Sequence, residues 1–369
     1  MIKIPNGQVG SAHLAEMRNP LYGNRTQWFT YELLDNGGAP KGSLANVTGG
    51  SLEWHANAAV KGGGKISVRQ PRLEPEDWLK RLVKIEMHIE GLGAFPLGVF
   101  VPSAPTEKWD DVGVEVEVEL LDKCSILDND YVAQTYSLPA GTNVTEAVRT
   151  LITSTGERAG SITDSSETLN NAMTWEGGTS KLAIINDLLS AANFFSLRAD
   201  GNGHFRVERK ELPRDRPLVH EFRQGHRALY LPAFAYEKDI YSIPNKVVMV
   251  GQGSGDQEAL VAVATNENPN SPYSFQQRSR WIVDVTTGVE ATSQEALNSK
   301  AAQRLHALTS PTGTLTIDHA PLPWLNVSEV VKFHSNDADI DIRGVIQSTK
   351  ITLDATALQH TEIQEVAEL

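Results

Sequence analysis

The amino-acid sequence predicts an α+β protein in which β structure predominates, and three observations lead to this fold class. Residues 83–89 and 114–119 alternate apolar and polar side chains, which is the pattern of a half-buried strand. In the middle of the chain, apolar residues recur at helical spacing around residues 144–152 and 182–192. The 369 residues are 40% hydrophobic and 21% charged, close to globular averages, and this length predicts two or three domains.

The first third of the chain has the pattern of an antiparallel sheet. Residues 28–34 lead into the turn residues Asp35–Gly38, which end a hairpin strand. In the segment 83–89, Val83, Ile85, Met87 and Ile89 face one way. Further strands are expected at 51–56, 65–69 and 95–101. We therefore expect a closed or strongly curled antiparallel sheet that ends near Asp122.

The middle of the chain mixes helices with short strands. Asn143 is a predicted helix cap, with Glu146 placed three residues later as in a capping box. A second helix is expected to begin at Thr179 or Ser180. A hairpin should follow, with strands 195–199 and 204–208 joined by Asp200–Gly203. The second helix should bury Leu182, Ile185, Leu188, Leu189 and Ala192.

The last third begins with a stiff, charged linker at Pro213–Pro217. Strands are expected at 245–250 and 260–264, followed by a helix that buries Leu297, Ala301 and Leu305. The remaining strands are expected at 313–317, 327–333, 339–343 and 350–353.

Composition and charge exclude several classes of protein. The formal net charge of −13 argues against duplex nucleic-acid binding through phosphate neutralisation. The single cysteine, Cys124, excludes a disulfide framework within one chain, and its apolar neighbours predict a buried, inert thiol. The apolar stretches are too short for a membrane-spanning helix. Residues 1–7 lack the pattern of a signal peptide, which predicts assembly in the cytoplasm.

Motifs that would carry catalysis or bind a metal fail at their spacing. Gly62–Lys65 lacks the first glycine and the final hydroxyl of a phosphate-binding loop. His220 begins a zinc-protease pattern, but Gln224 occupies the place of the second histidine. Residues 336–342 resemble the start of a calcium loop, with Ile342 where glycine is required. We therefore predict no catalytic residue, no cofactor and no metal site.

Acidic residues gather in two places. From Pro311 onward the chain has nine acidic and three basic residues, a net charge of −6. Two rows are expected on strand faces, and each row has two interpretations. They are solvated faces of a sheet, or they line a channel whose like charge lets DNA pass without sticking. The candidate channel-lining residues are Glu115, Glu117, Glu119, Asp337, Asp339 and Asp341.

The order of the parts resembles a known family. Short segments occur in the following order: Leu120–Lys123, Tyr136–Thr142, Trp175, Lys181–Leu189, Asp200–Gly203, Ile243–Val250, Asn268–Pro272, Ala301–Leu305 and Pro321–Pro323. This arrangement, which covers nearly the whole chain, resembles the tail-hub (baseplate hub) proteins of long-tailed bacteriophages. The resemblance is greatest to the minor tail proteins of actinobacterial siphophages.

The resemblance implies a ring-forming homotrimer in which each subunit contributes two similar β-barrel-like tube domains. Residues 1–122 would form the first tube domain. Residues 123–215 and about 253–310 would form a peripheral αβ domain. Residues about 216–252 and 311–369 would form the second tube domain. Three subunits would then present six similar units to a six-fold partner.

The resemblance also implies the partners and the location. One face of the ring would bind the distal tail protein or the tail tube, and the other a three-fold tip or central fibre protein. The tape-measure protein is a further partner, and genomic DNA would contact the ring only in transit. The protein would be a non-enzymatic component of the virion tail tip.

Two other functions stay open at this stage. Seven tryptophans and many carboxylates suit a glycan-binding or cell-wall-degrading tail protein, which needs two carboxyl groups across a cleft. A metal-stabilised adhesin using Asp337, Asp339 and Asp341 is the other alternative.

Overall fold

The computed structural model divides into two units, which are treated separately. Unit 1 consists of Met1–Phe234 and Thr316–Ile363, and unit 2 of Ala235–Leu315 and Gln364–Leu369. Within these units the structure describes residues 21, 25–71, 75–159, 162, 164–169, 171–238, 240–251, 260–289, 294–308 and 313–366. The N-terminal residues 1–7 discussed above lie outside this set.

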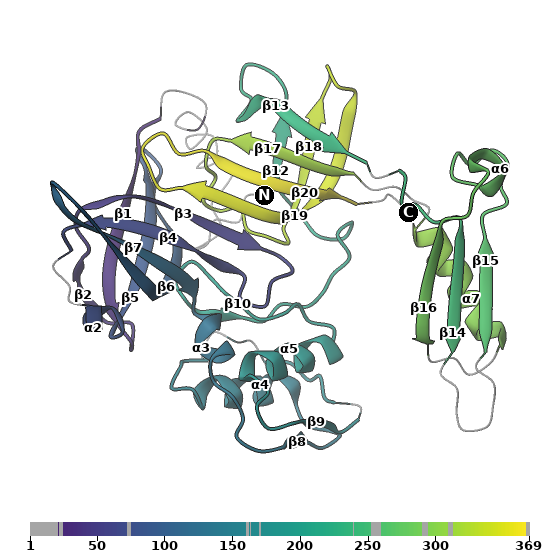
Figure 1. Ribbon diagram of the computed structural model, residues 1–369, viewed down its shortest axis with the longest axis horizontal. Helices are drawn as coiled ribbons and strands as arrows, with labels where there is room; N and C mark the ends of the chain where they lie inside the picture. Colours follow the sequence, from purple (N-terminus) through teal and green to yellow (C-terminus); the bar gives the residue numbers. More distant parts are fainter. Residues whose placement is uncertain are drawn as a thin grey trace. The chain divides into compact units, whose positions relative to one another are not determined.

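The first third of unit 1 is an antiparallel sheet, drawn in purple to blue in Figure 1. Its strand order is β3-β4-β7-β6-β5-β1-β2, and the short helix α2 (Pro75–Trp78) precedes β5. The predicted alternation is confirmed, because Val83, Ile85, Met87 and Ile89 are all buried. The strands are β1 (Gln27–Asp35), β2 (Pro40–Ser43), β3 (Val47–His55), β4 (Gly62–Arg69), β5 (Arg81–Ile89), β6 (Gly93–Asp110) and β7 (Gly113–Asp122).

A second set of strands continues the same sheet. These strands are β12 (Leu218–Arg223), β13 (Tyr230–Glu237), β17 (Thr314–His319), β18 (Val330–Ser335), β19 (Ile340–Thr352) and β20 (Gln359–Glu365). The strand β19 joins the two sets by pairing with β3, from Ser348 opposite His55 to Thr352 opposite Ser51. The segments 339–343 and 350–353, expected to be separate strands, therefore belong to one long strand.

The result is a 13-stranded sheet whose described pairings follow an open path from β13 to β2, with β12 and β18 branching from β19. The prediction of a predominantly β, α+β fold is confirmed. Aromatic side chains fill the core of the second set, where Phe222 contacts both Tyr230 and His319. The buried His319 ring bonds the backbone oxygen of Ala320 and the hydroxyl of Thr361.

Two glycines allow β3 and β4 to approach closely. Gly64 has a φ of +155°, and a Cβ on it would lie 2.0 Å from the backbone oxygen of Ser51. Gly50 has a φ of +158°, and its Cβ would lie 2.2 Å from the oxygen of Lys65. Only glycine fits such a contact, since any side chain would push the two strands apart.

The helices and short strands of unit 1 form a separate αβ layer. It contains α3 (Cys124–Asp128), β8 (Tyr136–Leu138), α4 (Val144–Thr153), β9 (Met173–Trp175), α5 (Lys181–Ala191), β10 (Arg198–Ala199) and β11 (Phe205–Arg206). Asn143 accepts a hydrogen bond from the Glu146 amide at 3.0 Å, and Ser180 caps α5 by accepting from the Ala183 amide. Both predicted helix starts are confirmed.

The core of this layer has the residues that the helical spacing predicted. Leu182, Ile185, Leu188 and Leu189 of α5 are fully buried, whereas Ala192 packs at the edge. Cys124 is also fully buried, and this burial raises the pKa of its thiol well above the ordinary value. The prediction of an inert cysteine is consistent with this environment.

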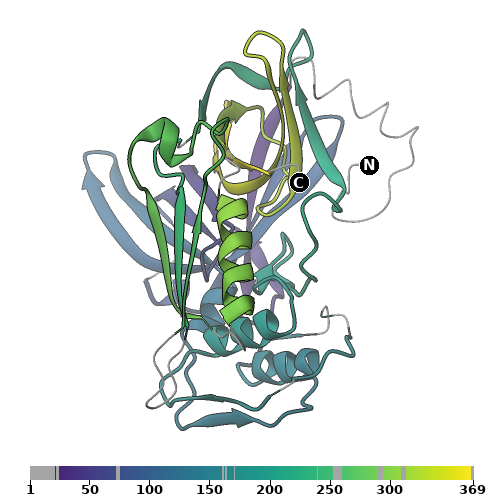
Figure 2. The same ribbon diagram turned by 90° about the vertical axis from the view of Figure 1, so that its right-hand side faces the viewer.

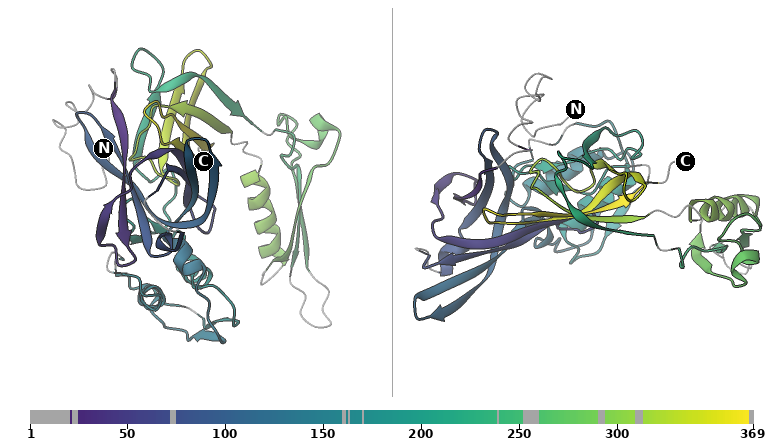
Figure 3. Two further views of the ribbon diagram at one scale, coloured as in Figure 1. Left: turned by 60° about the vertical axis from the view of Figure 1, so that its left-hand side comes forward. Right: turned by 90° about the horizontal axis from the view of Figure 1, so that it is seen from above.

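Unit 2 is a three-stranded sheet with a helix on one side (Figures 2 and 3). The strand β14 (Lys246–Gly251) lies between β15 (Val261–Thr265), which is antiparallel to it, and β16 (Val283–Val289), which is parallel. The helices are α6 (Phe275–Arg278) and α7 (Gln294–Leu308). The α7 stripe of Leu297, Ala301 and Leu305 is buried, as predicted, against Val247, Met249 and Ala262.

The segment 216–252 therefore contributes to both sheets. Its strands β12 and β13 join the large sheet, whereas β14 pairs only with β15 and β16 among the described strands. Within the described residues, no helix is both long and apolar enough to span a membrane.

Candidate functional site

The acidic row on β7 lies where the alternation places it. Val116 and Val118 are buried, so that Glu115, Glu117 and Glu119 project from the opposite side of the strand. The strand β4 lies on one side of β7 and the strand β6 on the other.

Basic residues of these two neighbouring strands lie among the glutamates. Lys65 of β4 and Lys108 of β6 both approach the Glu117 carboxylate, at 3.5 and 3.4 Å. These two ammonium groups, Lys108 first, lower the pKa of Glu117. Arg69, which lies opposite Glu115, forms a 2.8 Å ion pair with Asp110.

This surface, which we call the β7 face, is therefore not uniformly acidic. It has four carboxylates and three cations, a net formal charge of −1. These residues are Asp110, Glu115, Glu117, Glu119, Lys65, Arg69 and Lys108. The sequence alone did not reveal the three cations, because each comes from a strand other than β7. The sequence feature that could have indicated these cations is that Lys65, Arg69 and Lys108 occupy outward positions on strands next to β7.

The prediction that Asp337, Asp339 and Asp341 form a row on one strand face is wrong. Asp337 and Asp339 lie in the turn between β18 and β19, where Asp339 has a φ of +52°, and only Asp341 lies on a strand. The turn is held by Gln224, which donates to the Asp337 carboxylate and accepts from the Asn336 amide at 2.7 Å.

Asp341 is itself paired with cations. Its carboxylate lies 3.0 Å from Lys332 and 3.8 Å from the His334 ring nitrogen, both on β18. Within the described residues no group of three His, Cys, Asp or Glu side chains is placed to hold a metal ion. The three aspartates thus do not form a common ligand set.

A cavity of about 1240 Å³ lies within unit 1, and the sequence did not predict it. Three regions supply most of its lining: the residues around Trp54 and Lys61, the segment from Asn186 to Pro217, and the segment from Pro323 to Val330. These regions are distant in the sequence, so that no local pattern could indicate the cavity.

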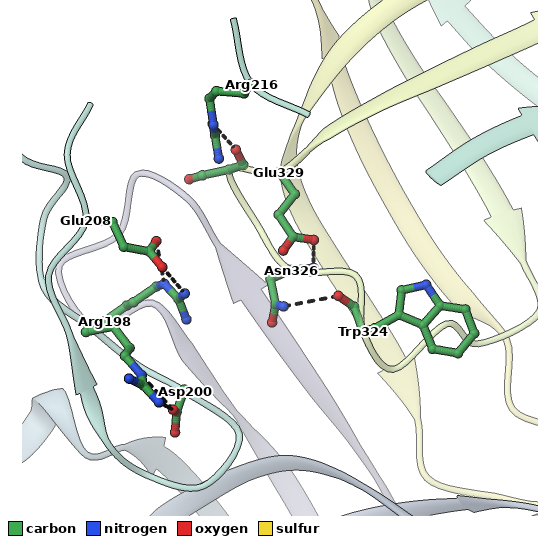
Figure 4. A network of polar contacts seen from close by, with 9 residues as sticks. Arg198, Asp200, Glu208, Arg216, Trp324, Asn326 and Glu329 are labelled. Carbon is green, nitrogen blue, oxygen red and sulfur yellow. Dashed lines mark hydrogen bonds and ion pairs between the residues drawn. The ribbon is translucent and has the colours of Figure 1, made fainter. Parts of the chain in front are cut away.

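Ion pairs and hydrogen bonds cross this cavity wall (Figure 4). Arg198 lies 2.8 Å from the Glu208 carboxylate, and Arg206 lies 2.7 Å from that of Asp200. Arg216 donates to the backbone oxygen of Ser328, which connects the linker to the segment before β18. Each of these three arginines thus has an acceptor within the chain. The first two pairs lie within the β10–β11 hairpin, and the Arg216 bond joins two segments that are distant in the sequence.

Within this network, Glu329 has the carboxyl group whose pKa departs most from its ordinary value. Its carboxylate accepts the Asn326 amide at 2.9 Å, which favours the ionised form. Burial has the larger effect and raises the pKa of Glu329 to about 7. The carboxyl group therefore changes charge near neutral pH.

The sequence matches no protein-family model and gives no significant match to a curated protein. Solved structures do match its fold. The 43 kDa tail protein of prophage MuSo2 from Shewanella oneidensis aligns with a TM-score of 0.63 and 13% identity, over 90% of this chain and 98% of that one. A tail protein from Neisseria meningitidis MC58 aligns with a TM-score of 0.63 and 12% identity, over 92% of this chain and 97% of that one.

A third structure extends the likeness beyond phages. The Escherichia coli c3393 protein is a type VI secretion component with structural similarity to the bacteriophage T4 tail proteins gp27 and gp5. It aligns with a TM-score of 0.50 and 10% identity, over 88% of this chain and 76% of that one. The chain therefore has a fold found in phage tail proteins.

Proposed function

We propose that the chain is a structural hub protein of a phage tail tip. The observation that carries this proposal is the match in fold to a phage tail protein over 90% of this chain and 98% of the other. The same kind of protein is expected from the order of the sequence segments. The arginines of the cavity are paired with acceptors of this chain, which suits a structural role rather than catalysis.

The proposed assembly is a homotrimeric ring. In each subunit the pairing of β19 with β3 holds the two strand sets side by side in one sheet. Three subunits would present six such sets around an axis, which suits a six-fold tail tube or distal tail protein on one side. The other side would keep three-fold symmetry for a tip or central fibre protein.

The oligomeric state tests this proposal. Mass photometry of the purified chain, alone and with the distal tail protein, should detect particles of three times the 40.3 kDa mass of one chain. Negative-stain images of these particles should have a central hole. Monomers alone, even beside the distal tail protein, would contradict the proposed hub.

We further propose that the β7 face lines the channel through which DNA leaves the particle. Of the six candidate residues, Glu115, Glu117 and Glu119 are retained, because they share a strand and an outward direction. A surface with a net charge near −1 neither binds the phosphate backbone tightly nor repels it strongly.

Changing these three glutamates to lysine should block DNA ejection while tails still assemble. The β7 face would go from a net charge of −1 to +5, and its lysines would hold the phosphates of passing DNA. Ejection from triggered particles measures the effect, and the triple glutamine variant is the control because it adds no positive charge. Normal ejection by the lysine variant would exclude these residues from the channel.

One observation favours the glycan-processing alternative. Glu329, with a pKa raised to about 7, lies on a cavity that also contains the Asp200 and Glu208 carboxylates. Such a raised pKa suits a general acid. Asp200 and Glu208 are, however, paired with arginines. Clear turnover of host cell wall in a zymogram, lost in Glu329→Gln, would establish this alternative.

A further inference from the structure

Unit 2 has a sheet face that no described segment of unit 2 covers. The helix α7 packs on one side of the three strands. The register places six valines on the other side, since Val248 pairs with Val263 and Val285, and Val250 pairs with Val261. We call this surface the valine face, formed by Val248, Val250, Val261, Val263, Val283 and Val285.

The valine face is exposed to an unusual degree. Val261, Val263, Val283 and Val285, on the two strands that flank β14, are 50%, 54%, 45% and 59% exposed. Contiguous apolar patches on a protein surface are often contact surfaces, whereas scattered single apolar residues are not.

The area of the valine face limits what can cover it. Three strands about 4.8 Å apart, with about 3.3 Å per residue over five residues, give on the order of 250 Å². A stable two-partner interface needs about 800 Å² on each side. The valine face packed on a second valine face would therefore not hold a dimer, and we expect it to be one contact among several in a larger assembly.

The chain itself offers an element that fits such a face, the tip of the β6–β7 hairpin. This hairpin extends beyond its neighbouring strands (Figure 3). At its tip Trp109 is 74% exposed and Val112 is 67% exposed. Tryptophan is enriched among the residues that contribute most to binding at protein interfaces.

The tip is rigid before it binds. The Asp110 carboxylate accepts the amides of Val112 and Gly113 at 2.9 and 3.0 Å, and it also pairs with Arg69. Gln70 donates to the backbone oxygen of Val112 at 3.0 Å. Since these bonds already fix the turn, little conformational entropy is lost when Trp109 docks.

Charge also matches between the two surfaces. Lys246 lies at one edge of the valine face, opposite Thr265 and Val283. The tip has Asp111 between Asp110 and Val112. An ammonium at the rim of one apolar patch and a carboxylate at the rim of the other would favour one orientation of docking.

We propose that the valine face of one copy of the chain binds the β6–β7 tip of the next copy. The contact joins two different patches, so that repeating it about a three-fold axis generates a ring rather than a two-fold dimer. This inference rests on the proposed ring-forming function and names the surfaces through which the ring closes.

Cross-linking between two variants that each have one added cysteine tests the contact. Val112→Cys and Val263→Cys chains are mixed before assembly and treated with a short bis-maleimide, while Cys124 stays buried in both. The mixture should give covalent dimers, whereas each variant alone and the wild type should give none. Dimers from Val263→Cys alone would mean that the valine face packs on itself, which would overturn the proposal.

Particle mass separates failure of this contact from failure of the proposed function. Particles of trimer mass without cross-links in the mixture would overturn the contact and leave the ring standing. Absence of such particles in the wild type, even with the distal tail protein, would overturn the hub function itself.

Two sets of substitutions measure the contribution of each patch. Trp109→Ala should weaken ring formation at least 10-fold without lowering the stability of the single chain, because Trp109 is exposed there. Leu79→Ala, at a position 77% exposed, is the matched control and should change nothing. Equal weakening by Leu79→Ala would contradict the docking.

An exchange of charges tests the orientation of the contact. Lys246→Glu and Asp111→Lys should each weaken assembly, and the two substitutions together should restore it. Absence of this rescue would contradict the docking.

Discussion

The Gly64→Ala variant is expected to lose about 3 kcal/mol of the free energy of unfolding of unit 1. The new Cβ would lie 2.0 Å from the Ser51 oxygen and 2.9 Å from the Cα of Leu52, both of which belong to the backbone of β3. No side-chain rotation relieves such a contact, and a φ of +155° strains any residue other than glycine. The strands must separate, next to the place where β3 pairs with β19.

Gly49→Ala is the matched control for this prediction. Gly49 lies on β3, the strand that pairs with the β4 strand of Gly64, and a Cβ on it would meet nothing within 4 Å. Six of the seven tryptophans lie in unit 1, so that their fluorescence during urea unfolding reports mainly on that unit. Equal urea midpoints for Gly64→Ala and Gly49→Ala would contradict the close approach of β3 and β4.

Replacing Glu329 by glutamine should stabilise unit 1 above neutral pH and have little effect in acid. The folded pKa of Glu329 is about 7, above the ordinary value of 4.5. Below pH 4.5 the carboxyl group is protonated in both states and has no effect on stability. Between these values the unfolded chain releases the proton and the folded chain holds it, which lowers stability by about 1.4 kcal/mol per pH unit.

The glutamine variant lacks this penalty and keeps an oxygen to accept the Asn326 amide. Its gain in stability should therefore grow from pH 4.5 and level off above pH 7, at about 3 kcal/mol. Urea unfolding at pH 5 and pH 8 measures the difference, and Glu107→Gln, at an exposed position, controls for the loss of one negative charge. If the glutamine variant were less stable than the wild type at pH 8, this prediction would be wrong, and Arg198 would instead be stabilising the ionised form of Glu329.

Local patterns predicted much of the fold of unit 1. The alternation at 83–89, the caps at Asn143 and Ser180 and the buried stripe of α5 are all present. Each depends on residues close together in the chain, so that strand or helix periodicity determines which side chains are buried.

The sequence was less informative about the acidic residues. The spacing of Asp337, Asp339 and Asp341 suits a strand as well as a turn. The structure has a turn at Asp337 and Asp339, held by Gln224, which directly follows β12. Likewise the glutamates of β7 suggested a uniformly acidic wall until Lys65 and Lys108 were placed beside Glu117.

The sequence by itself determined the fold class, the main strands and helices and the burial of Cys124, because these follow from periodicity, capping and turn residues. Only the tertiary structure decided that β19 pairs with β3, that Glu329 is partly buried and that the valine face is left uncovered. Those features depend on contacts between segments far apart in the chain, and such contacts are set by how whole elements pack rather than by any local pattern.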